Sequence, residues 1–359
     1  MLDVLVFGAT GFTGRLVATA LARRGARFAI AGRDRGRLET VALQTGAHEV
    51  TVAAAGDVDA LADAAGRARV LVACVGPFVE LGETGVRAAL RAGSHYVDST
   101  GEAPFIAGML ERFDEPAEAA AITLAPALAF DEVPADVAAT VAVAGMEGAD
   151  LTLTYAVPSH ATPATVRSSL RILTWQGTWL RGGIREPVRT GELGRWAPLP
   201  PPLGPRATFS AHMAEGWLAP LHLDVASVGT YLATSTARRA ALRVALPLLN
   251  AAVARPPLRK AAEMALRAVA PHPRDDRARN KRWTVLAEAS GSGRTRAVSV
   301  TGVDTYGLSG DLLAAGALRL AHHPPPGGGV RAPVQAIGLS TWTSELAARG
   351  ATIQVFEPR

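Results

Sequence analysis

The sequence predicts an α/β protein with a doubly wound parallel sheet, followed by a second α+β domain built on a mainly antiparallel sheet. Over about the first 130 residues, short apolar runs alternate with segments of helical periodicity, which is the pattern of parallel βαβ units. Beyond about residue 133, polar and apolar residues alternate within the predicted strands, as in a sheet with one packed face. The 359 residues suffice for two domains with separate cores.

The elements of the first half follow from this periodicity. Residues 4–7 form a continuous apolar run, typical of a strand buried on both faces. The segment 13–24 repeats apolar residues at helical spacing, and Gly25 ends that helix. The same alternation continues, with strands predicted at 28–31, 50–54, 70–75, 95–98 and 121–127, and helices at 35–45, 58–65 and 83–92.

The second half has a different pattern. Two strands, 283–289 and 296–304, flank Gly291-Ser292-Gly293 and predict a hairpin. Further extended segments are predicted at 151–157, 222–234 and 351–356, helices at 163–173, 238–254, 259–269, 309–322 and 334–349, and loops at 198–205 and 324–329. We therefore expect domains at 1–132 and 133–330, and a C-terminal helix and strand at 331–359 that could pack back near the first domain.

Composition narrows the class of protein. The single cysteine, Cys74, excludes an intramolecular disulfide and a zinc site of clustered thiolates, and no HExxH spacing occurs, so no metal is expected. The longest apolar stretch, 119–130, is too short to span a bilayer, and the N-terminus lacks the features of a signal peptide. We expect a cytoplasmic protein without a transmembrane segment. The net charge of +5 comes from scattered arginines without interleaved aromatics, which argues against nucleic acid and for an anionic small molecule.

The strongest motif follows the first strand and opens the first helix. Glycines there let the backbone turn sharply and approach a pyrophosphate, and the N-terminus of the helix directs its N–H groups at the phosphates. A tight turn without a ligand is the alternative. The position between strand and helix favours a Rossmann-type dinucleotide-binding domain, with cofactor contacts from Gly8, Ala9, Thr10, Gly11, Phe12, Thr13 and Gly14.

The end of the second strand indicates which dinucleotide binds. An acidic residue there would bind the ribose of NAD, but this chain has Arg33. A guanidinium suits the 2′-phosphate of NADP, and Arg37 could add a second contact. We therefore expect NADP(H). Two alternatives stay open: Arg33 could be a solvated loop residue, and the adjacent Asp34 could hold the ribose of NAD.

Two further segments are predicted to contact the cofactor. In a doubly wound sheet, ligands lie at the carboxyl ends of the strands. Asp57, after the third strand, could reach the adenine amino group, or it could only cap the next helix. The loop after the fourth strand should face the nicotinamide, with contacts from Cys74, Val75, Gly76, Pro77 and Phe78. We expect Cys74 to be a small buried hydrophobe rather than a nucleophile.

Candidate catalytic residues follow the fifth and sixth strands. Tyr96 and Asp98 lie two apart, so both side chains leave the same face of the strand, where they could donate a proton or anchor a substrate. Alternatively, Asp98 caps the next turn and Glu102 is solvated. Asp131 starts the second domain, where a substrate cleft is expected, and is the third candidate. The nearby Asp136 could serve only as a helix-terminal charge.

Together these motifs resemble the saccharopine dehydrogenase-like NADP-binding oxidoreductases, and within them the trans-acting enoyl reductases. The motifs are GATGFTG at 8–14, AGR at 31–33, CVGPF at 74–78, HYVDSTGE at 95–102, FDEVPAD at 130–136 and, more loosely, SGDLLAAGALRLA at 309–321 and GVRAP at 329–333. The resemblance implies NADPH-dependent hydride transfer to a conjugated C=C bond of a small or polyketide-derived substrate. An imine C=N bond, or an NADP(H)-binding sensor or partner protein without catalysis, are the alternatives. Glu132 departs from the family's motif, which has a small hydroxyl residue there.

The middle of the chain, about 150–300, matches no family motif. All six tryptophans lie beyond residue 170, and Trp175 and Trp179 could line a pocket for a bulky or aromatic substrate or pack in a core. A proton donor could come from His160, His212 or His222, although each could be structural. The basic stretch 237–270 could touch a membrane surface or an acidic carrier protein, or be a solvated helical face. We also consider a homodimer.

Overall fold

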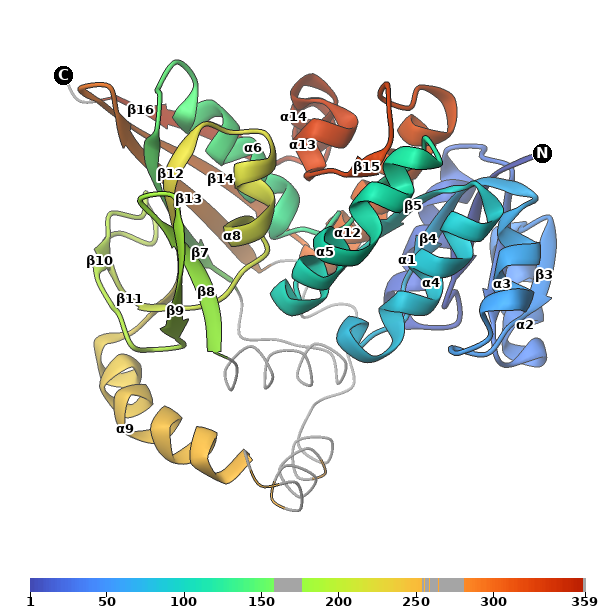
Figure 1. The fold of residues 1–359 in the computed structure, drawn as a ribbon, viewed down its shortest axis with the longest axis horizontal. Helices are drawn as coiled ribbons and strands as arrows, with labels where there is room; N and C mark the ends of the chain where they lie inside the picture. Colours follow the sequence, from blue (N-terminus) through green and yellow to red (C-terminus); the bar gives the residue numbers. More distant parts are fainter. Residues whose placement is uncertain (158–175, 254, 256–257, 259–263, 265–280, 358–359) are drawn as a thin grey trace. The chain divides into compact units, whose positions relative to one another are not determined.

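The computed structural model describes the whole chain except residues 158–175, 254, 256–257, 259–263, 265–280 and 358–359. The chain forms two compact units (Figure 1). The first contains Met1–Val133 and Thr305–Arg349, and the second contains Pro134–Asp304 and Gly350–Arg359. Each is described below by itself.

The first unit is built on a seven-stranded parallel sheet, which confirms the predicted doubly wound fold. Its strand order is β15-β6-β5-β4-β1-β2-β3. Because β1 pairs with β2 on one side and with β4 on the other, the strand order reverses at β1, and a ligand site is expected at the carboxyl ends of β1 and β4. The strands are β1 Leu2–Phe7, β2 Phe28–Gly32, β3 Glu49–Val52, β4 Ala68–Ala73, β5 His95–Asp98, β6 Thr123–Ala125 and β15 Gly329–Val330.

Helices cover the strands of this sheet. They are α1 Phe12–Arg23, α2 Arg35–Thr45, α3 Val58–Ala65, α4 Phe78–Ala92, α5 Ala103–Ala119, α12 Thr305–His322, α13 Pro333–Ile337 and α14 Leu339–Ala348. One core joins alternate residues of β1 and β4, among them Leu5, Phe7 and Leu71, to α3, α4 and α5. α12 packs on β1, β4 and β5 and beside α1. The helix α6, Glu132–Val143, begins in this unit and continues into the second.

Several helices differ from the prediction. α5 and α6 had not been predicted, and the single helix expected at 334–349 is divided into α13 and α14 at Gly338, whose φ of 103° interrupts a helix. α12 was expected in the second domain but lies in the first unit. The reason is its burial: nearly every residue of Thr305–Ala317 and Leu320–Ala321 is buried, and its contacts are to α1 and the parallel sheet.

The second unit is built on a nine-stranded mixed sheet, in which most neighbours are antiparallel. The order is β10-β11-β12-β7-β13-β14-β16, with β8 paired to β12 and β9. Among the described strands of this second sheet, only β12 and β7 pair in parallel. The elements are β7 Ala149–Ala156, β8 Gln176–Arg181, β9 Ile184–Arg189, β10 Trp196–Ala197, β11 Arg206–Ser210, α8 Glu215–Leu218, the 3₁₀-helix η1 Ala219–Leu221, β12 Val225–Thr234, α9 Thr236–Val253, β13 Arg282–Gly291, β14 Arg294–Val303 and β16 Thr352–Phe356.

The predicted hairpin is present in this sheet, next to its β16 edge. β13 and β14 pair from Arg282 opposite Val303 to Gly291 opposite Arg294. Both turn residues have positive φ, 51° at Ser292 and 71° at Gly293, as a type I′ turn requires. The strands β7 and β16 extend the sheet on either side. In the part of the chain that the structure describes, no helix is long and apolar enough to cross a membrane.

Candidate cofactor and active site

The glycine loop brings the ends of β1 and β4 into close contact. Gly8 has a φ of 86°, and a Cβ on it would lie 2.7 Å from Val75 Cγ2 and 2.9 Å from the Cys74 carbonyl oxygen. A Cβ on Gly14 would lie 2.3 Å from the Gly8 carbonyl oxygen. The Gly11 N–H donates to the same oxygen at 2.9 Å. Glycine is therefore required at both positions for α1 to begin directly behind β1.

The N-terminus of α1 suits an anion. Its N-cap is Gly11, so no side chain caps the helix, and its first turn contains no acidic residue. Phe12 and Thr13, the first two residues of the helix, are half-exposed. The positive end of the helix dipole is thus not neutralised by the chain's own carboxylates in that turn.

Two charged residues follow β2: Asp34 caps the next helix, and Arg33 is exposed to solvent. Asp34 Oδ1 accepts a hydrogen bond from the Arg37 N–H at 3.0 Å and caps α2. The Arg37 guanidinium reaches back to the Thr10 carbonyl oxygen at 3.2 Å. Arg33 is exposed. The Asp34 carboxylate is thus engaged by the N-terminus of α2, and the contact of Arg33 with a 2′-phosphate stays a prediction.

Asp57 is a helix cap in the same way. Its Oδ1 accepts from the Ala60 N–H at 3.0 Å at the start of α3. This is the simpler of the two roles expected from the sequence, and the predicted contact with adenine stays a prediction.

The loop after β4 is held by the carboxylate of Glu102. This side chain is only 1% exposed, which contradicts the alternative that it is solvated. Its Oε1 accepts from the Phe78 N–H at 3.0 Å and its Oε2 from the Val79 N–H at 3.1 Å. The side chain therefore caps the N-terminus of α4 and fixes the loop at 74–78, in which Gly76 and Pro77 are joined by a cis peptide bond.

Cys74, at the start of the same loop, is influenced by burial and by the nearby Asp98 carboxylate. Burial raises the pKa of its thiol to about 12, and the Asp98 carboxylate acts in the same direction. The thiol is therefore protonated at neutral pH, which agrees with the expectation that Cys74 is not a nucleophile.

Tyr96 and Asp98 are in contact, but in the core. Both are 0% exposed, and the Tyr96 hydroxyl donates to Asp98 Oδ2 at 2.8 Å. Asp98 Oδ1 accepts from the Thr100 and Ala127 N–H groups, both at 2.9 Å. Burial raises the pKa of Asp98 to about 6, although these hydrogen bonds act in the opposite direction. The pair joins the end of β5 to the segment after β6.

Of the three catalytic candidates, Asp131 is accessible. It is half-exposed in the turn before α6. The adjacent Phe130 N–H donates to Ser309 Oγ of α12 at 3.1 Å, which fixes this turn in the first unit. Glu132 is 1% exposed, and a Cβ on Gly101 would lie 2.7 Å from its Oε1.

In the second unit, Asp136 and His222 form a buried pair. His222 Nε2 lies 2.8 Å from Asp136 Oδ1, and their side chains are 10% and 2% exposed respectively. Asp136 is thus more than the helix-terminal charge considered above, because it orients an imidazole.

Of the remaining tryptophan and histidine candidates for the substrate pocket, some are buried and others lie outside the described residues. Trp179 is on the strand β8, not on a helix; it is 4% exposed, and its Nε1 donates to the Ala211 carbonyl oxygen at 3.3 Å. Burial lowers the pKa of His212 to about 4, so this imidazole is neutral. Trp175 and His160 lie outside the described residues, as do the helices predicted at 163–173 and 259–269.

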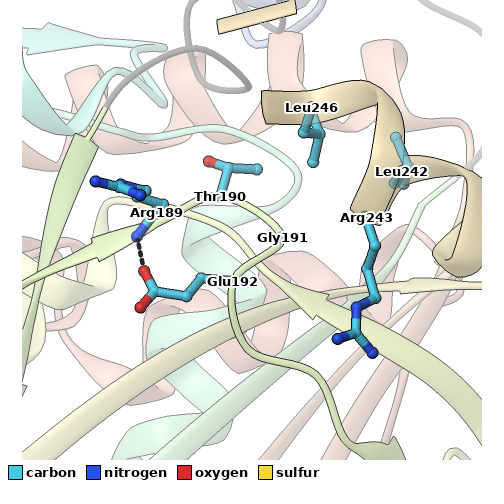
Figure 2. Close-up of a pocket in the computed structure, with 7 residues that line it drawn as sticks. All are labelled: Arg189, Thr190, Gly191, Glu192, Leu242, Arg243 and Leu246. Atoms are coloured by element: carbon cyan, nitrogen blue, oxygen red, sulfur yellow. Dashed lines mark hydrogen bonds between the residues drawn. The ribbon is translucent and has the colours of Figure 1, made fainter. Parts of the chain in front are cut away.

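A cavity of about 370 Å³ lies in the second unit, between the turn after β9 and one face of α9 (Figure 2). Glu192 Oε2 accepts from the Arg189 N–H at 2.8 Å and stabilises the turn. A Cβ on Gly191 would lie 2.5 Å from Leu246 Cδ1, so glycine lets the turn approach the helix. The lining residues are Arg189, Thr190, Gly191, Glu192, Leu242, Arg243 and Leu246, none of which had been predicted as a site residue.

No group of three or more His, Cys, Asp or Glu side chains that could hold a metal ion occurs among the described residues.

Comparison with known proteins finds relatives for the N-terminal third of the chain. Residues 4–125 match the saccharopine dehydrogenase NADP binding domain. Over 140 residues the chain is 37% identical to a trans-acting enoyl reductase of Mycobacterium leprae, covering 37% of this chain and 34% of that protein. A trans-acting enoyl reductase of Mycobacterium tuberculosis is 35% identical over the same length. The chain thus matches about a third of the length of these relatives.

A solved structure extends the likeness to the whole fold. The apo histidine-tagged saccharopine dehydrogenase (L-Glu forming) from Saccharomyces cerevisiae has a TM-score of 0.66 with full coverage of both chains, at 14% identity. The family match confirms the predicted cofactor, NADP(H). The chain therefore has the saccharopine dehydrogenase fold, and residues 4–125 match the saccharopine dehydrogenase NADP binding domain.

Proposed function

We propose that this protein is an NADPH-dependent reductase that transfers hydride to a conjugated C=C bond of a small or polyketide-derived substrate. The observation that carries the proposal is the cradle formed by Gly8 and Gly14 at an uncapped helix N-terminus, with Arg33 exposed beyond it. The enoyl substrate is suggested by the trans-acting enoyl reductases that share this part of the chain.

The residues present fit NADP(H). Gly8 and Gly14 let the loop pack tightly between β1, α1 and the end of β4, as a dinucleotide-binding turn requires, and the N-terminus of α1 supplies N–H donors for a pyrophosphate. Arg33 supplies a cation for the 2′-phosphate. When bound, NADPH supplies the hydride. We assign the loop at 74–78 to the nicotinamide side of this site.

The protein's own groups then have three tasks. The Glu102 carboxylate holds the 74–78 loop through the Phe78 and Val79 N–H groups. The buried Tyr96–Asp98 pair acts as a positioning element, because it joins β5 to the segment that leads to Asp131. We assign Asp131 to orienting the substrate or relaying the proton, since it is the accessible carboxylate of the three candidates.

The cofactor half of the proposal is tested by fluorescence titration with NADPH and NADH. Arg33→Ala should weaken NADPH binding by about tenfold or more and leave NADH binding almost unchanged, because one charge-assisted contact is lost. Arg35→Ala is the matched control. This exposed arginine starts α2, and its Nη1 lies 3.7 Å from Glu39 Oε1. Equal effects of the two variants would contradict the assignment of Arg33.

The catalytic half is tested by NADPH oxidation with a panel of enoyl thioesters and cyclic imines. We expect turnover with the enoyl substrates, reduced at least tenfold in Asp131→Asn with NADPH affinity retained. Turnover with imines alone would favour a C=N reductase. If NADPH binds and no substrate is reduced, the protein is a sensor or partner protein and the catalytic proposal fails.

A further inference from the structure

A tyrosine from the distant C-terminal segment lies against the glycine loop. The rings of Phe12 and Tyr306 meet edge to face, with centroids 5.0 Å apart and an interplanar angle of 88°. Phe12 is the first residue of α1, and Tyr306 is the second residue of α12. Both rings are half-exposed, so this pair lies at the accessible edge of the loop rather than in the core.

The position of Tyr306 is fixed from two sides. A Cβ on Gly310 would lie 2.7 Å from Leu16 Cβ, so α12 approaches α1 as closely as a glycine permits. Ser309 Oγ accepts from the Phe130 N–H at 3.1 Å and donates to the Thr305 carbonyl oxygen at 2.9 Å. The first turn of α12 is thus attached both to the helix that follows the glycine loop and to the turn that carries Asp131.

The other tyrosines are differently placed. Of the four in the chain, Tyr96 and Tyr155 are fully buried, and Tyr231 is in the second unit, where it packs on Trp179. Tyr306 alone combines a partly accessible ring with a position in the cofactor-binding unit. A tyrosine ring can pack its apolar body on Phe12 while its hydroxyl bonds to a phosphate or ribose oxygen.

We infer that Tyr306 is part of the NADP(H) site and that its hydroxyl forms a hydrogen bond to the bound cofactor. The inference rests on the proposed cofactor site at α1. The ring packs on Phe12, the first residue of the helix whose N-terminus would meet the pyrophosphate. The dinucleotide site would thereby include a residue that is separated from the glycine loop in sequence by Pro134–Asp304 of the second unit.

The test is the affinity for NADPH of Tyr306→Phe, which keeps the ring on Phe12 and removes only the hydroxyl. We expect a Kd about five- to tenfold higher than in the unchanged protein, as for the loss of one hydrogen bond. Tyr231→Phe, which removes the same group from a half-buried ring in the second unit, should bind NADPH normally. An unchanged Kd in Tyr306→Phe would overturn the inference.

A second measurement needs no variant. The protein is treated with tetranitromethane with and without saturating NADP⁺, and nitrated tyrosines are identified by mass spectrometry. Tyr306 should be protected by NADP⁺ and Tyr231 should not. Equal nitration of Tyr306 in both samples, in a protein that binds NADPH, would remove it from the site. If the unchanged protein binds no NADPH at all, the proposed cofactor site itself fails, which is a separate outcome.

Discussion

The buried Glu102 carboxylate offers the sharpest test of how the cofactor loop is held. In Glu102→Gln the side chain keeps one oxygen acceptor for Phe78 or Val79 but presents an amide donor to the other N–H. The change loses one hydrogen bond to a charged acceptor, about 1.5–3 kcal/mol, and leaves a buried donor unsatisfied, about 1–3 kcal/mol. Because the side chain can relax in part, we expect about 2–4 kcal/mol less protection of the first turn of α4.

Hydrogen exchange measures the stability of this one turn directly. A local measurement is needed because the two units of the chain need not unfold together. Amides of a peptide covering 74–82 should exchange roughly 30- to 700-fold faster in Glu102→Gln, since each 1.4 kcal/mol is a factor of ten. The matched control is Glu83→Gln on the same helix, whose carboxylate is 35% exposed and pairs with Arg87 and Arg112 at the surface. That variant should change exchange by fivefold or less. Equal exchange in Glu102→Gln and the unchanged protein would refute the capping role.

Three further results are expected. Gly14→Ala should abolish NADPH binding in a fluorescence titration, because its Cβ would lie 2.3 Å from the Gly8 carbonyl oxygen; retained affinity would show that the loop can shift. Burial raises the pKa of Asp98 to about 6, above the unfolded value of about 3.9, so its stabilising contribution is present at low pH and is lost as pH rises through 6. The unfolding free energy, measured relative to Asp98→Asn, should therefore be about 1.4 kcal/mol greater at pH 5 than at pH 7.5, and a difference of opposite sign would refute this. Cys74, with a pKa of about 12, should react with iodoacetamide at pH 7.5 far more slowly than free cysteine, as followed by mass spectrometry; rapid alkylation would mean that the thiol is not buried as described.

The fold of the first unit was predictable because its strands are local apolar runs. The helix α5 was missed for an equally local reason. It contains Pro104 and Pro116, which suggest breaks in a sequence, yet Pro104 falls in the first turn, where its missing N–H has no helical partner to lose. The position of α12 in the first unit was not predictable, because its contacts are to residues roughly two to three hundred positions earlier in the sequence.

The candidate site was likewise predictable only in part. The glycine loop and Arg33 are recognisable because a short segment carries the whole geometric requirement. The sequence does not reveal the role of Glu102. The residue caps α4 only because the segment after β5 approaches the start of that helix in the folded chain. Tyr306 has no motif around it, and it reaches the loop only through the contact between α12 and α1.

The two-part construction of the first unit has a consequence for synthesis on the ribosome. The strands of residues 1–133 emerge first, but α12 and the edge strand β15 follow only after Pro134–Asp304 of the second unit has been translated. Until then the apolar strands β1, β4 and β5 lack the helix that packs on them, and β6 lacks its neighbour β15. A nascent chain stalled before Thr305 should thus be a substrate for chaperones or proteases, although the region that matches the NADP-binding family is by then fully translated.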